Sequence, residues 1–371
     1  MPSVTSKDPG CIHLGMDTSI DAIVVGILAP DDQTPAVDRI FNDEPSVRRL
    51  IARFPDRSVL AACYEAGPGG YGLHRLLTSL GVSCDVVAPT LIPKGSSDRV
   101  KTDRRDAIRL ARLHRAGELT PIRVPSPAEE AVRDLLRVRA DLVAGRKRVQ
   151  QQISALLLRH GRIWRTGKKW TQPHRAWLAR QTFDEPALNT ALSAYRSALT
   201  IRESEVTALE AELHALAANA AMAPLVSRLA CYRGIAELTA LTLAAEVIDW
   251  RRFATARAFM SYTGLTTAEY SSGTRTRRGA ITKAGSASLR TALVESAWSY
   301  RARPAVGYRL QVRQRGATAD TIARSWAAQQ RLCGKFHKMT AAGKTPVVAA
   351  TAVARELAGF LWAEMTADTA A

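Results

Sequence analysis

Four carboxylates stand where predicted strands end or a predicted helix begins. Asp17 follows the apolar run IHLGM, and Glu65 closes the apolar run VLAACYE just before a glycine turn. Asp103 and Asp106 are three residues apart at the start of a predicted helix, so they face the same side of it. Carboxylates that meet at one edge of a parallel α/β sheet repel one another unless a cation lies between them. The pattern therefore indicates a divalent-metal site, with Mg²⁺ favoured because it prefers oxygen ligands and shares phosphates.

Each carboxylate also has a purely structural interpretation. Asp17 and Asp21 fit a hairpin turn, the helix dipole favours Asp103, and Asp106 fits an ion pair with a neighbouring arginine. Glu65 is harder to explain this way, because a charge that ends an apolar strand is costly unless it is paired or binds metal. As a set, the four residues favour metal. Two ions about 3.5–4 Å apart activate an attacking oxygen and stabilise a leaving one in phosphoryl transfer.

A serine in a basic stretch is the second candidate for chemistry. The segment EYSSGTRTRRGAITKAG contains Ser271 and Ser272 directly before Gly273. A serine hydroxyl is a weak nucleophile that needs a base or a metal. Four cations in the segment are suited to hold a phosphate and offset its charge: Arg275, Arg277, Arg278 and Lys283. From the residues alone, a basic loop that only grips backbone phosphate is the favoured interpretation.

The charge of the chain indicates a polyanionic partner. Its 371 residues include 52 Lys and Arg against 34 Asp and Glu, a net charge of +18. Nucleic acid is the simplest such partner, although a ribosomal or chromatin-like protein would carry the same surplus. Five scattered cysteines without CxxC spacing fit a reducing cytoplasm. We see no signal peptide and no apolar stretch near the roughly 18 residues of a membrane span, so we expect a cytoplasmic protein without membrane contact.

The fold class predicted is α/β plus α. Residues 1–125 begin with two β-rich runs around a turn at 18–21, continue with a short third strand at RIFND, and then alternate strands with helices. Three strands in a meander followed by this alternation are typical of a ribonuclease H-like, RuvC-type domain. Residues 226–371 are predicted to be a mainly helical C-terminal domain.

Residues 126–225 are predicted to form a helical arm. One helix is expected from about Ala128 to His160. In a second helix, the 4-3 spacing continues without a break from Leu188 to Leu216. Every residue at these positions is apolar except Arg202. This is the pattern of a coiled-coil seam, and we expect an antiparallel coiled coil or pairing with another subunit. Helices of an ordinary bundle remain the alternative.

Between the two helices, the segment GRIWRTGKKWTQPHRAW interleaves basic and aromatic side chains. Six of them are candidates for contact with nucleic acid: Arg162, Trp164, Lys168, Lys169, Trp170 and Arg175. Cations neutralise phosphates while indoles stack on unpaired bases. The alternative, that the tryptophans only cover the end of the arm, is equally consistent with the sequence.

The segments discussed above resemble a known family. GMDTSIDAIVVGIL, YEAGPGGYGLHRLL and KTDRRDAIRLARL are similar to the N-terminal blocks of DEDD-type insertion-sequence transposases, relatives of Piv-type DNA invertases. YTGLTTAEYSSGTRTRRGAITKAGSASLRTALVESAW resembles their C-terminal transposase block. The resemblance runs from about Ile12 to Trp298 in the family's order, with small departures at Met16 and Ala236. It implies that Asp17, Glu65, Asp103 and Asp106 are the metal-binding tetrad and that Ser272 is the nucleophile.

The function implied is a DNA recombinase that moves an insertion sequence. Ser272 would attack a phosphodiester and form a covalent phosphoserine link, assisted by metal at the tetrad. The resemblance further implies donor and target DNA, an element-encoded bridge RNA as guide, and dimers that assemble into tetramers. Two rivals are a metal-dependent nuclease of the Holliday-junction type, which uses only carboxylates and water, and a non-catalytic nucleic-acid-binding protein.

Overall fold

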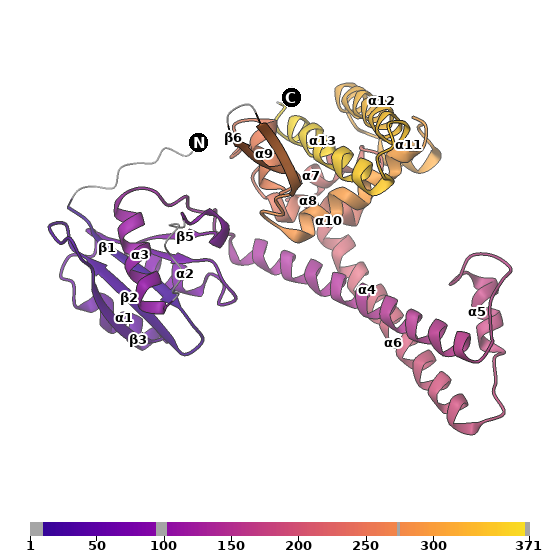
Figure 1. The fold of residues 1–371 in the computed structure, drawn as a ribbon, viewed down its shortest axis with the longest axis horizontal. Helices are drawn as coiled ribbons and strands as arrows, with labels where there is room; N and C mark the ends of the chain where they lie inside the picture. The colour runs from indigo at the N-terminus through magenta and orange to yellow at the C-terminus, as the bar shows by residue number, and fades with distance from the viewer. Residues whose placement is uncertain (1–9, 94–101, 273–274, 368–371) are drawn as a thin grey trace. The chain divides into compact units, whose positions relative to one another are not determined.

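The computed structural model describes residues 10–93, 102–272 and 275–367, with the side chains of residues 271–276 outside the description. The chain divides after Ser126 into two compact units, residues 1–126 and 127–371, each with its own core (Figure 1). The first unit contains a five-stranded sheet, and the second is mainly helical.

The sheet of the first unit has the strand order β3-β2-β1-β4-β5. Antiparallel pairing joins β1 to β2 and β2 to β3, whereas β1 and β4 are parallel, as are β4 and β5. The strands are β1 (Ile12–Thr18), β2 (Ala22–Leu28), β3 (Ala36–Phe41), β4 (Leu60–Glu65) and β5 (Ser83–Val87). The predicted mixed α/β architecture is confirmed, and this sheet is compatible with a ribonuclease H-like domain.

Helices cover both faces of this sheet. On one face, Leu14 and Met16 of β1 pack in a core with α1 (Glu44–Ala52) and α2 (Gly72–Ser79). On the other face lies α3 (Asp103–Arg115), which is packed on β1 and β2. Successive strand residues alternate between faces, so every second residue of β1 meets α3.

Two glycines set how closely α3 approaches the sheet. Gly15 of β1 and Gly26 of β2 are cross-strand partners. A Cβ on Gly15 would lie 2.4 Å from the Ala107 carbonyl oxygen and 2.3 Å from the Ala111 nitrogen, and one on Gly26 would lie 2.7 Å from that same oxygen. These distances are below any van der Waals contact. The backbone of α3 therefore rests directly on the backbone of the sheet.

The second unit begins with two long antiparallel helices, α4 (Pro127–Arg159) and α6 (Pro186–Ala217), joined through α5 (Gln172–Ala179) (Figure 1). The antiparallel direction follows from contacts near both ends, Arg139 with Glu210 and the cluster that contains Leu157 and Leu192. The predicted seam is the buried face of α6, where four residues spaced by seven are buried: Leu192, Leu199, Val206 and Leu213.

The one polar residue in that seam lies next to a glycine. Arg202 forms an ion pair with Glu205 and lies across from Gly145, whose added Cβ would come within 3.8 Å of the Arg202 side chain. At this distance a Cβ would make only ordinary van der Waals contact, so alanine would also fit opposite the arginine. Knobs-into-holes packing of the pair as a coiled coil stays a prediction, as does the separation of the arm from the C-terminal domain.

The remaining elements pack around a single large core. They are α7 (Ala223–Ala230), α8 (Glu237–Val247), α9 (Ala256–Tyr262), β6 (Thr267–Ser272), β7 (Arg275–Ile281), α10 (Ala287–Ala297), α11 (Tyr308–Arg313), α12 (Ala319–Ala341) and α13 (Pro346–Thr366). Short 3₁₀ turns occupy Pro89–Leu91 and Trp298–Arg301.

Helix α13 corrects one expectation. Among the described residues it is long and apolar enough to cross a membrane, contrary to the prediction that no such stretch exists. Its buried side includes Val353, Leu357 and Leu361, which belong to the core of the second unit. Packing of this side against the rest of the second unit accounts for the apolar residues on it.

A buried carboxylate joins α13 to its neighbours. Glu364 is fully buried, with Oε1 3.0 Å from Arg228 Nε and Oε2 2.6 Å from Arg324 Nε. The hydroxyls of Thr321 and Tyr232 donate to it at 2.8 and 3.3 Å. Burial raises the pKa of this carboxyl, but the hydrogen bonds from Arg324, Thr321 and Arg228 outweigh burial and hold the pKa below its usual value.

Replacing Gly15 with Ala should destabilise the first unit. The new Cβ would clash with backbone atoms of α3, which cannot yield as a flexible side chain does. Overpacking of this kind costs about 1–3 kcal/mol or more. Urea denaturation of Gly15→Ala should show this loss, while Gly72→Ala, with open space around it, serves as the control. Equal stability of the two variants would contradict the packing described here.

Replacing Glu364 with Gln should destabilise the second unit by roughly 2–4 kcal/mol at neutral pH, because it leaves two arginines without their shared partner. A folded-state pKa below 4.5 means that the carboxylate stabilises the fold above that pH and ceases to do so as the pH falls. The difference from the native protein in thermal unfolding should therefore shrink in acid. Glu295→Gln, on an exposed face of α10, is the control.

Candidate active site

Asp17 and Glu65 lie at the carboxyl ends of two adjacent parallel strands. Met16 of β1 is in register with Tyr64 of β4, so Asp17 and Glu65 are the next residues of each strand. Met16 and Tyr64 face the core under α1 and α2. Alternation therefore directs the two carboxylates to the face that carries α3. Both side chains are half-buried there.

The first turn of α3 supplies the other two carboxylates. The helix starts at Asp103 because the Thr102 side chain caps it by accepting a hydrogen bond from the Arg105 N–H. Asp103 is exposed. Asp106 is only 9% exposed, and Arg109 Nη2 lies 3.1 Å from its Oδ1. Its Oδ2 is buried without a hydrogen-bond partner among the described residues.

The structure therefore places three of the four carboxylates on one face and edge of the sheet, and the fourth on the exposed start of the helix above that face. Among residues 10–93, 102–272 and 275–367, no three His, Cys, Asp or Glu side chains are close enough to form a metal-binding group. The buried, partnerless oxygen of Asp106 nevertheless fits a cation ligand, since such an atom is costly without a partner. The tetrad stays a prediction.

A histidine pair at the other end of α3 was not predicted as a unit. His13 Nδ1 lies 3.2 Å from His114 Nδ1, and His114 Nε2 lies 3.2 Å from Asp85 Oδ2. Both imidazoles are buried. The contacts fasten the end of α3 to β1 and β5. A sequence signal existed, because His13 shares the strand face of Asp17 and His114 shares the helix face of Ala107 and Ala111.

In the second unit, Ser272 is the last residue of β6. The hairpin of β6 and β7 is antiparallel, with Ser272 opposite Arg275 and Tyr270 opposite Arg277. The side chains of Ser272 and Arg275 lie outside the described residues, so their predicted roles are not tested by contacts. Arg277 and Arg278 are exposed on β7, and Lys283 is exposed just beyond it with a positive φ of 56°.

A groove of about 860 Å³ lies beside this hairpin. It extends from Thr267, Glu269 and Arg278 of the hairpin to α9 and α13. Four arginines and two glutamates contribute its charge: Arg257, Arg278, Arg331, Arg355, Glu269 and Glu356. Glu356 is occupied by Arg331 and Lys335, and within the described chain no carboxylate pairs with Arg257 or Arg355. The groove is suited to an anionic ligand, and sequence analysis did not identify Arg257, Arg331 or Arg355.

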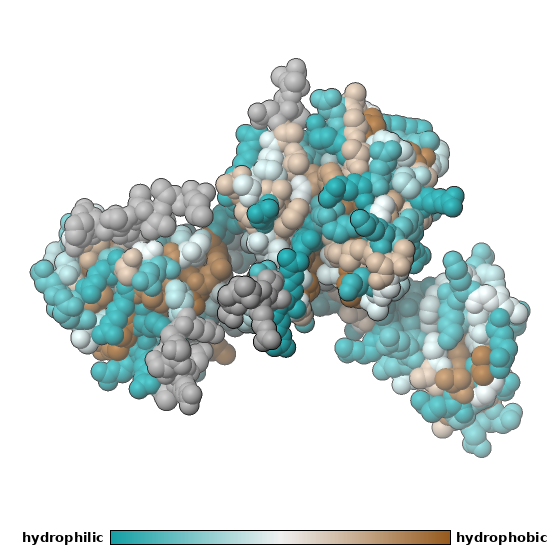
Figure 2. Space-filling model, turned by 45° about the horizontal axis from the view of Figure 1, so that its top comes forward, coloured by the Kyte–Doolittle hydropathy of each residue, from teal (hydrophilic) through white to brown (hydrophobic). Residues whose placement is uncertain are grey.

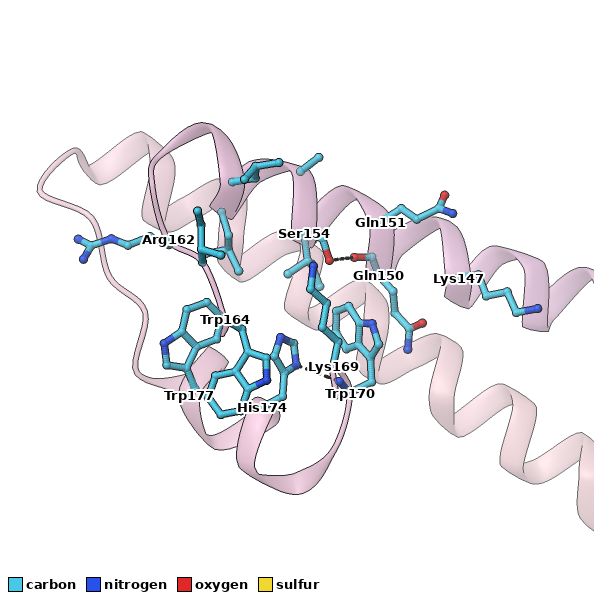
Figure 3. A pocket seen from close by; sticks show the side chains of 15 residues that line it. Lys147, Gln150, Gln151, Ser154, Arg162, Trp164, Lys169, Trp170, His174 and Trp177 are labelled. Carbon is cyan, nitrogen blue, oxygen red and sulfur yellow. Dashed lines mark hydrogen bonds between the residues drawn. The ribbon is translucent and has the colours of Figure 1, made fainter. Parts of the chain in front are cut away.

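The basic and aromatic segment lies at the far end of the α4–α6 pair. Trp170 packs on the apolar cluster of the arm. Arg175 of α5 donates two hydrogen bonds to Glu203 of α6, at 2.9 and 2.6 Å. Lys168 and Lys169 are exposed, and Arg162 points away from the tryptophans (Figure 3). The structure thus assigns Trp170 and Arg175 a packing role, and contact of the segment with nucleic acid stays a prediction.

If Asp106 is a metal ligand, Mg²⁺ should stabilise the first unit, and changing Asp106 to Asn should abolish most of that stabilisation. A ligand present at 100 times its Kd stabilises a fold by about 2.7 kcal/mol, which a thermal melt with and without Mg²⁺ resolves. Asn keeps the size of Asp106 but removes its charge. Asp21→Asn, at an exposed hairpin turn, should retain the native shift. An unchanged shift in Asp106→Asn would contradict a metal role for this residue.

Comparison with known proteins identifies both units. A family model described as "Transposase IS116/IS110/IS902 family" matches residues 226–309, and the DEDD transposase model of the IS110 group matches residues 14–161. The chain is 43% identical over 318 residues to "Putative transposase y4qE" of Sinorhizobium fredii, covering 86% of this chain and 77% of that relative. It is 31% identical over 335 residues to the "Transposase for insertion sequence element IS1533" of Leptospira borgpetersenii, covering 88% of this chain and 96% of the relative.

The matched domains bear directly on the site. A DEDD transposase domain implies a divalent metal, usually Mg²⁺, and the carboxylates on the α3 face of the sheet lie within the matched residues. The basic hairpin with Ser272 lies within the other match. Both domains and the similarity over most of the chain agree: this protein belongs to the IS116/IS110/IS902 family and is an insertion-sequence DNA transposase.

Proposed function

We propose that this transposase cuts and rejoins DNA by attack of the Ser272 hydroxyl on a phosphodiester. The Oγ–H proton leaves, a bond forms between Oγ and phosphorus, and the bond from phosphorus to one nucleoside oxygen breaks and that oxygen takes up a proton. Attack by a strand hydroxyl on the serine phosphodiester then reverses the exchange. One P–O bond forms for each that breaks, so rejoining needs no external energy source.

The position of Ser272 carries this proposal. It is the last residue of β6, at the tip of a hairpin whose second strand presents exposed arginines. Arg277 and Arg278 lie on β7, where guanidinium groups are suited to bind the phosphate oxygens and offset the charge that develops there.

The neighbouring groove supplies a path for the rest of the strand. Arg257 and Arg355, which pair with no carboxylate of the described chain, line it together with Arg278 of the hairpin. Phosphates that flank the reacting one would lie along these guanidinium groups. Positively charged grooves track the backbone of nucleic acid in this way.

The carboxylates of the first unit would hold the divalent metal. Asp17, Glu65, Asp103 and Asp106 are the proposed ligands, supported by the shared face of three of them and by the buried Oδ2 of Asp106. When bound, the ion lowers the pKa of an attacking hydroxyl and neutralises charge on the phosphate. Serine otherwise lacks a base, since no histidine is near it in sequence. The proposal includes assembly of dimers and tetramers that bring both units to one phosphate.

The proposal also includes a bridge RNA that pairs with donor and target DNA. The net charge of +18 is what is left after every carboxylate has been offset by a cation, and the tip of the arm carries cations beside indoles. These features suit an RNA partner in addition to DNA.

A metal-dependent nuclease that uses the carboxylates and water is the second candidate. The buried Asp106 oxygen favours it, because this candidate metal ligand lies in the DEDD domain. Hydrolysis by metal and water at that domain would need no residue of the second unit. The two functions differ in one product, the covalent bond between protein and DNA.

Ser272→Ala should abolish the covalent adduct that forms with labelled element-end DNA in the presence of Mg²⁺. The yield of adduct should fall by at least about 10³-fold, because only Oγ can form the bond. Denaturing gels detect the adduct. Ser271→Ala is the matched control and should retain it. Persistence of strand cleavage in Ser272→Ala, with no adduct in the native protein, would instead establish the nuclease.

A further inference from the structure

A cavity of about 510 Å³ lies at the tip of the arm (Figure 3). One wall is α4, with Lys147, Gln150, Gln151 and Ser154. The opposite wall is the loop and helix that follow, with Lys169 and four rings: Trp164, Trp170, His174 and Trp177. The volume is within the range of about 300–1,000 Å³ that small-molecule sites occupy. Tryptophans that only covered the ends of the helices would not need to leave a cavity of this size.

The rings form a connected cluster around His174. Its ring centroid lies 5.0 Å from that of Trp170, 5.5 Å from Trp164 and 5.6 Å from Trp177. Trp170 adopts a φ of 66°, a left-handed conformation that bulky residues rarely adopt, and its N–H donates to His174 Nδ1 at 3.1 Å. The position of the Trp170 indole is therefore fixed by the backbone and by the imidazole.

The tryptophans do not all have the same role. Trp170 and Trp177 pack against the apolar cluster of Ile153, Leu157 and Leu178, so they do close the end of the arm. Trp164 is not part of that cluster. It is half-buried, touches only the rings of His174 and Trp177 among the described aromatic side chains, and lines the cavity. Trp164 is thus the indole left for an incoming flat ring.

The charge of the residues that line the cavity favours an anionic ligand. None of the fifteen described residues that line the cavity is acidic, and Lys147 and Lys169 are cationic, whereas the guanidinium of Arg162 turns toward Phe183. Burial, followed by the charges of Lys169 and Arg175, lowers the pKa of His174, so the imidazole is neutral near pH 7. The cavity therefore combines an uncharged aromatic wall with cations around it. The amides of Gln150 and Gln151 add donors and acceptors suited to the edge of a base.

Exposed apolar side chains in the lining of the cavity suit a partner that covers them. Leu158 and Ile163, both in the lining, are 61% and 45% exposed. Figure 2 shows apolar residues (brown) among hydrophilic ones (teal) on the surface of the arm tip. A purely apolar partner would leave the surrounding cations unpaired, and a small anion would leave the rings uncovered. A base with its flanking phosphates satisfies both.

We infer that this cavity binds one unstacked nucleotide of a single-stranded nucleic acid, with the base against Trp164 and the flanking phosphates at Lys147 and Lys169. The inference rests on the proposed nucleic-acid role of the arm but not on the chemistry of Ser272. Duplex is excluded because its bases are already stacked and paired and present no free face to an indole. The strand comes either from a guide RNA or from DNA unpaired during transposition, two sources with the same chemistry.

The experiment measures binding by the full-length Ser272→Ala protein in EDTA, so neither the nucleophile nor metal contributes. Fluorescence anisotropy is recorded with labelled oligouridylate, oligothymidylate and a duplex of equal length. Trp164→Ala should weaken single-strand binding roughly tenfold, because the stacking of one base on an aromatic side chain contributes about a tenfold gain in affinity. Trp164→Phe should restore most of it. Duplex binding should not change, and the strand type most affected identifies the source.

A charge-matched pair tests the phosphate contacts. Lys169→Gln should reduce the slope of log affinity against log salt by about 0.7 for a single strand. Arg180→Gln removes the same charge from the exposed end of α5, outside the cavity, and should leave the slope unchanged. Photo-cross-linking with 4-thiouridine or 5-bromodeoxyuridine should map to residues 162–177. Native affinity in a folded Trp164→Ala protein, or cross-links confined to other segments, would overturn the inference.

Discussion

The direct contact between α3 and the sheet is the constraint on which the first unit depends. Only glycine at both Gly15 and Gly26 lets the helix backbone rest on the strand backbones, since any Cβ would occupy the space of Ala107. This contact fixes the height and rotation of α3. Asp106 is consequently held in the first turn above the strand ends, and His114 is held against His13 and Asp85 at the other end of the helix. The position of Asp106, a proposed metal ligand, therefore depends on two strand glycines that contact the next residue of the helix, Ala107.

The cations of the second unit serve two purposes. Arg228 and Arg324 neutralise the buried Glu364, and Arg139 and Arg175 join α4 and α5 to α6 through Glu210 and Glu203. These guanidinium groups are engaged within the fold. Arg257 and Arg355 of the groove and Lys169 of the arm tip form no ion pair with a carboxylate of the described chain. The cations of this second set are available to a polyanion at the hairpin groove and at the tip of the arm.

These two sites suit different parts of a nucleic acid. The groove beside β6 and β7 is rich in arginine and has no aromatic cluster, which favours backbone phosphate next to the residue proposed to react with it. The cavity at the arm tip combines indoles, amides and lysines, which favours an exposed base. A transposase that must hold paired and unpaired strands at once benefits from such a division, because stacking and phosphate contact require different side chains.

The sequence by itself determined the elements and their order. Alternation marked the strands, glycine and proline marked the turns, and the seven-residue spacing of Leu192, Leu199, Val206 and Leu213 marked the buried face of α6. It also indicated the carboxylates at the strand ends and the basic segment around Ser272, since residue type and local position carry that information. Only the tertiary structure decided which partner each residue meets. His13 and His114 are 101 positions apart, Arg175 is engaged by Glu203, and α13 packs in a core although it is long and apolar enough to cross a membrane. Local periodicity reports that a side chain is buried or charged, whereas pairing depends on how distant elements pack, which no local pattern encodes.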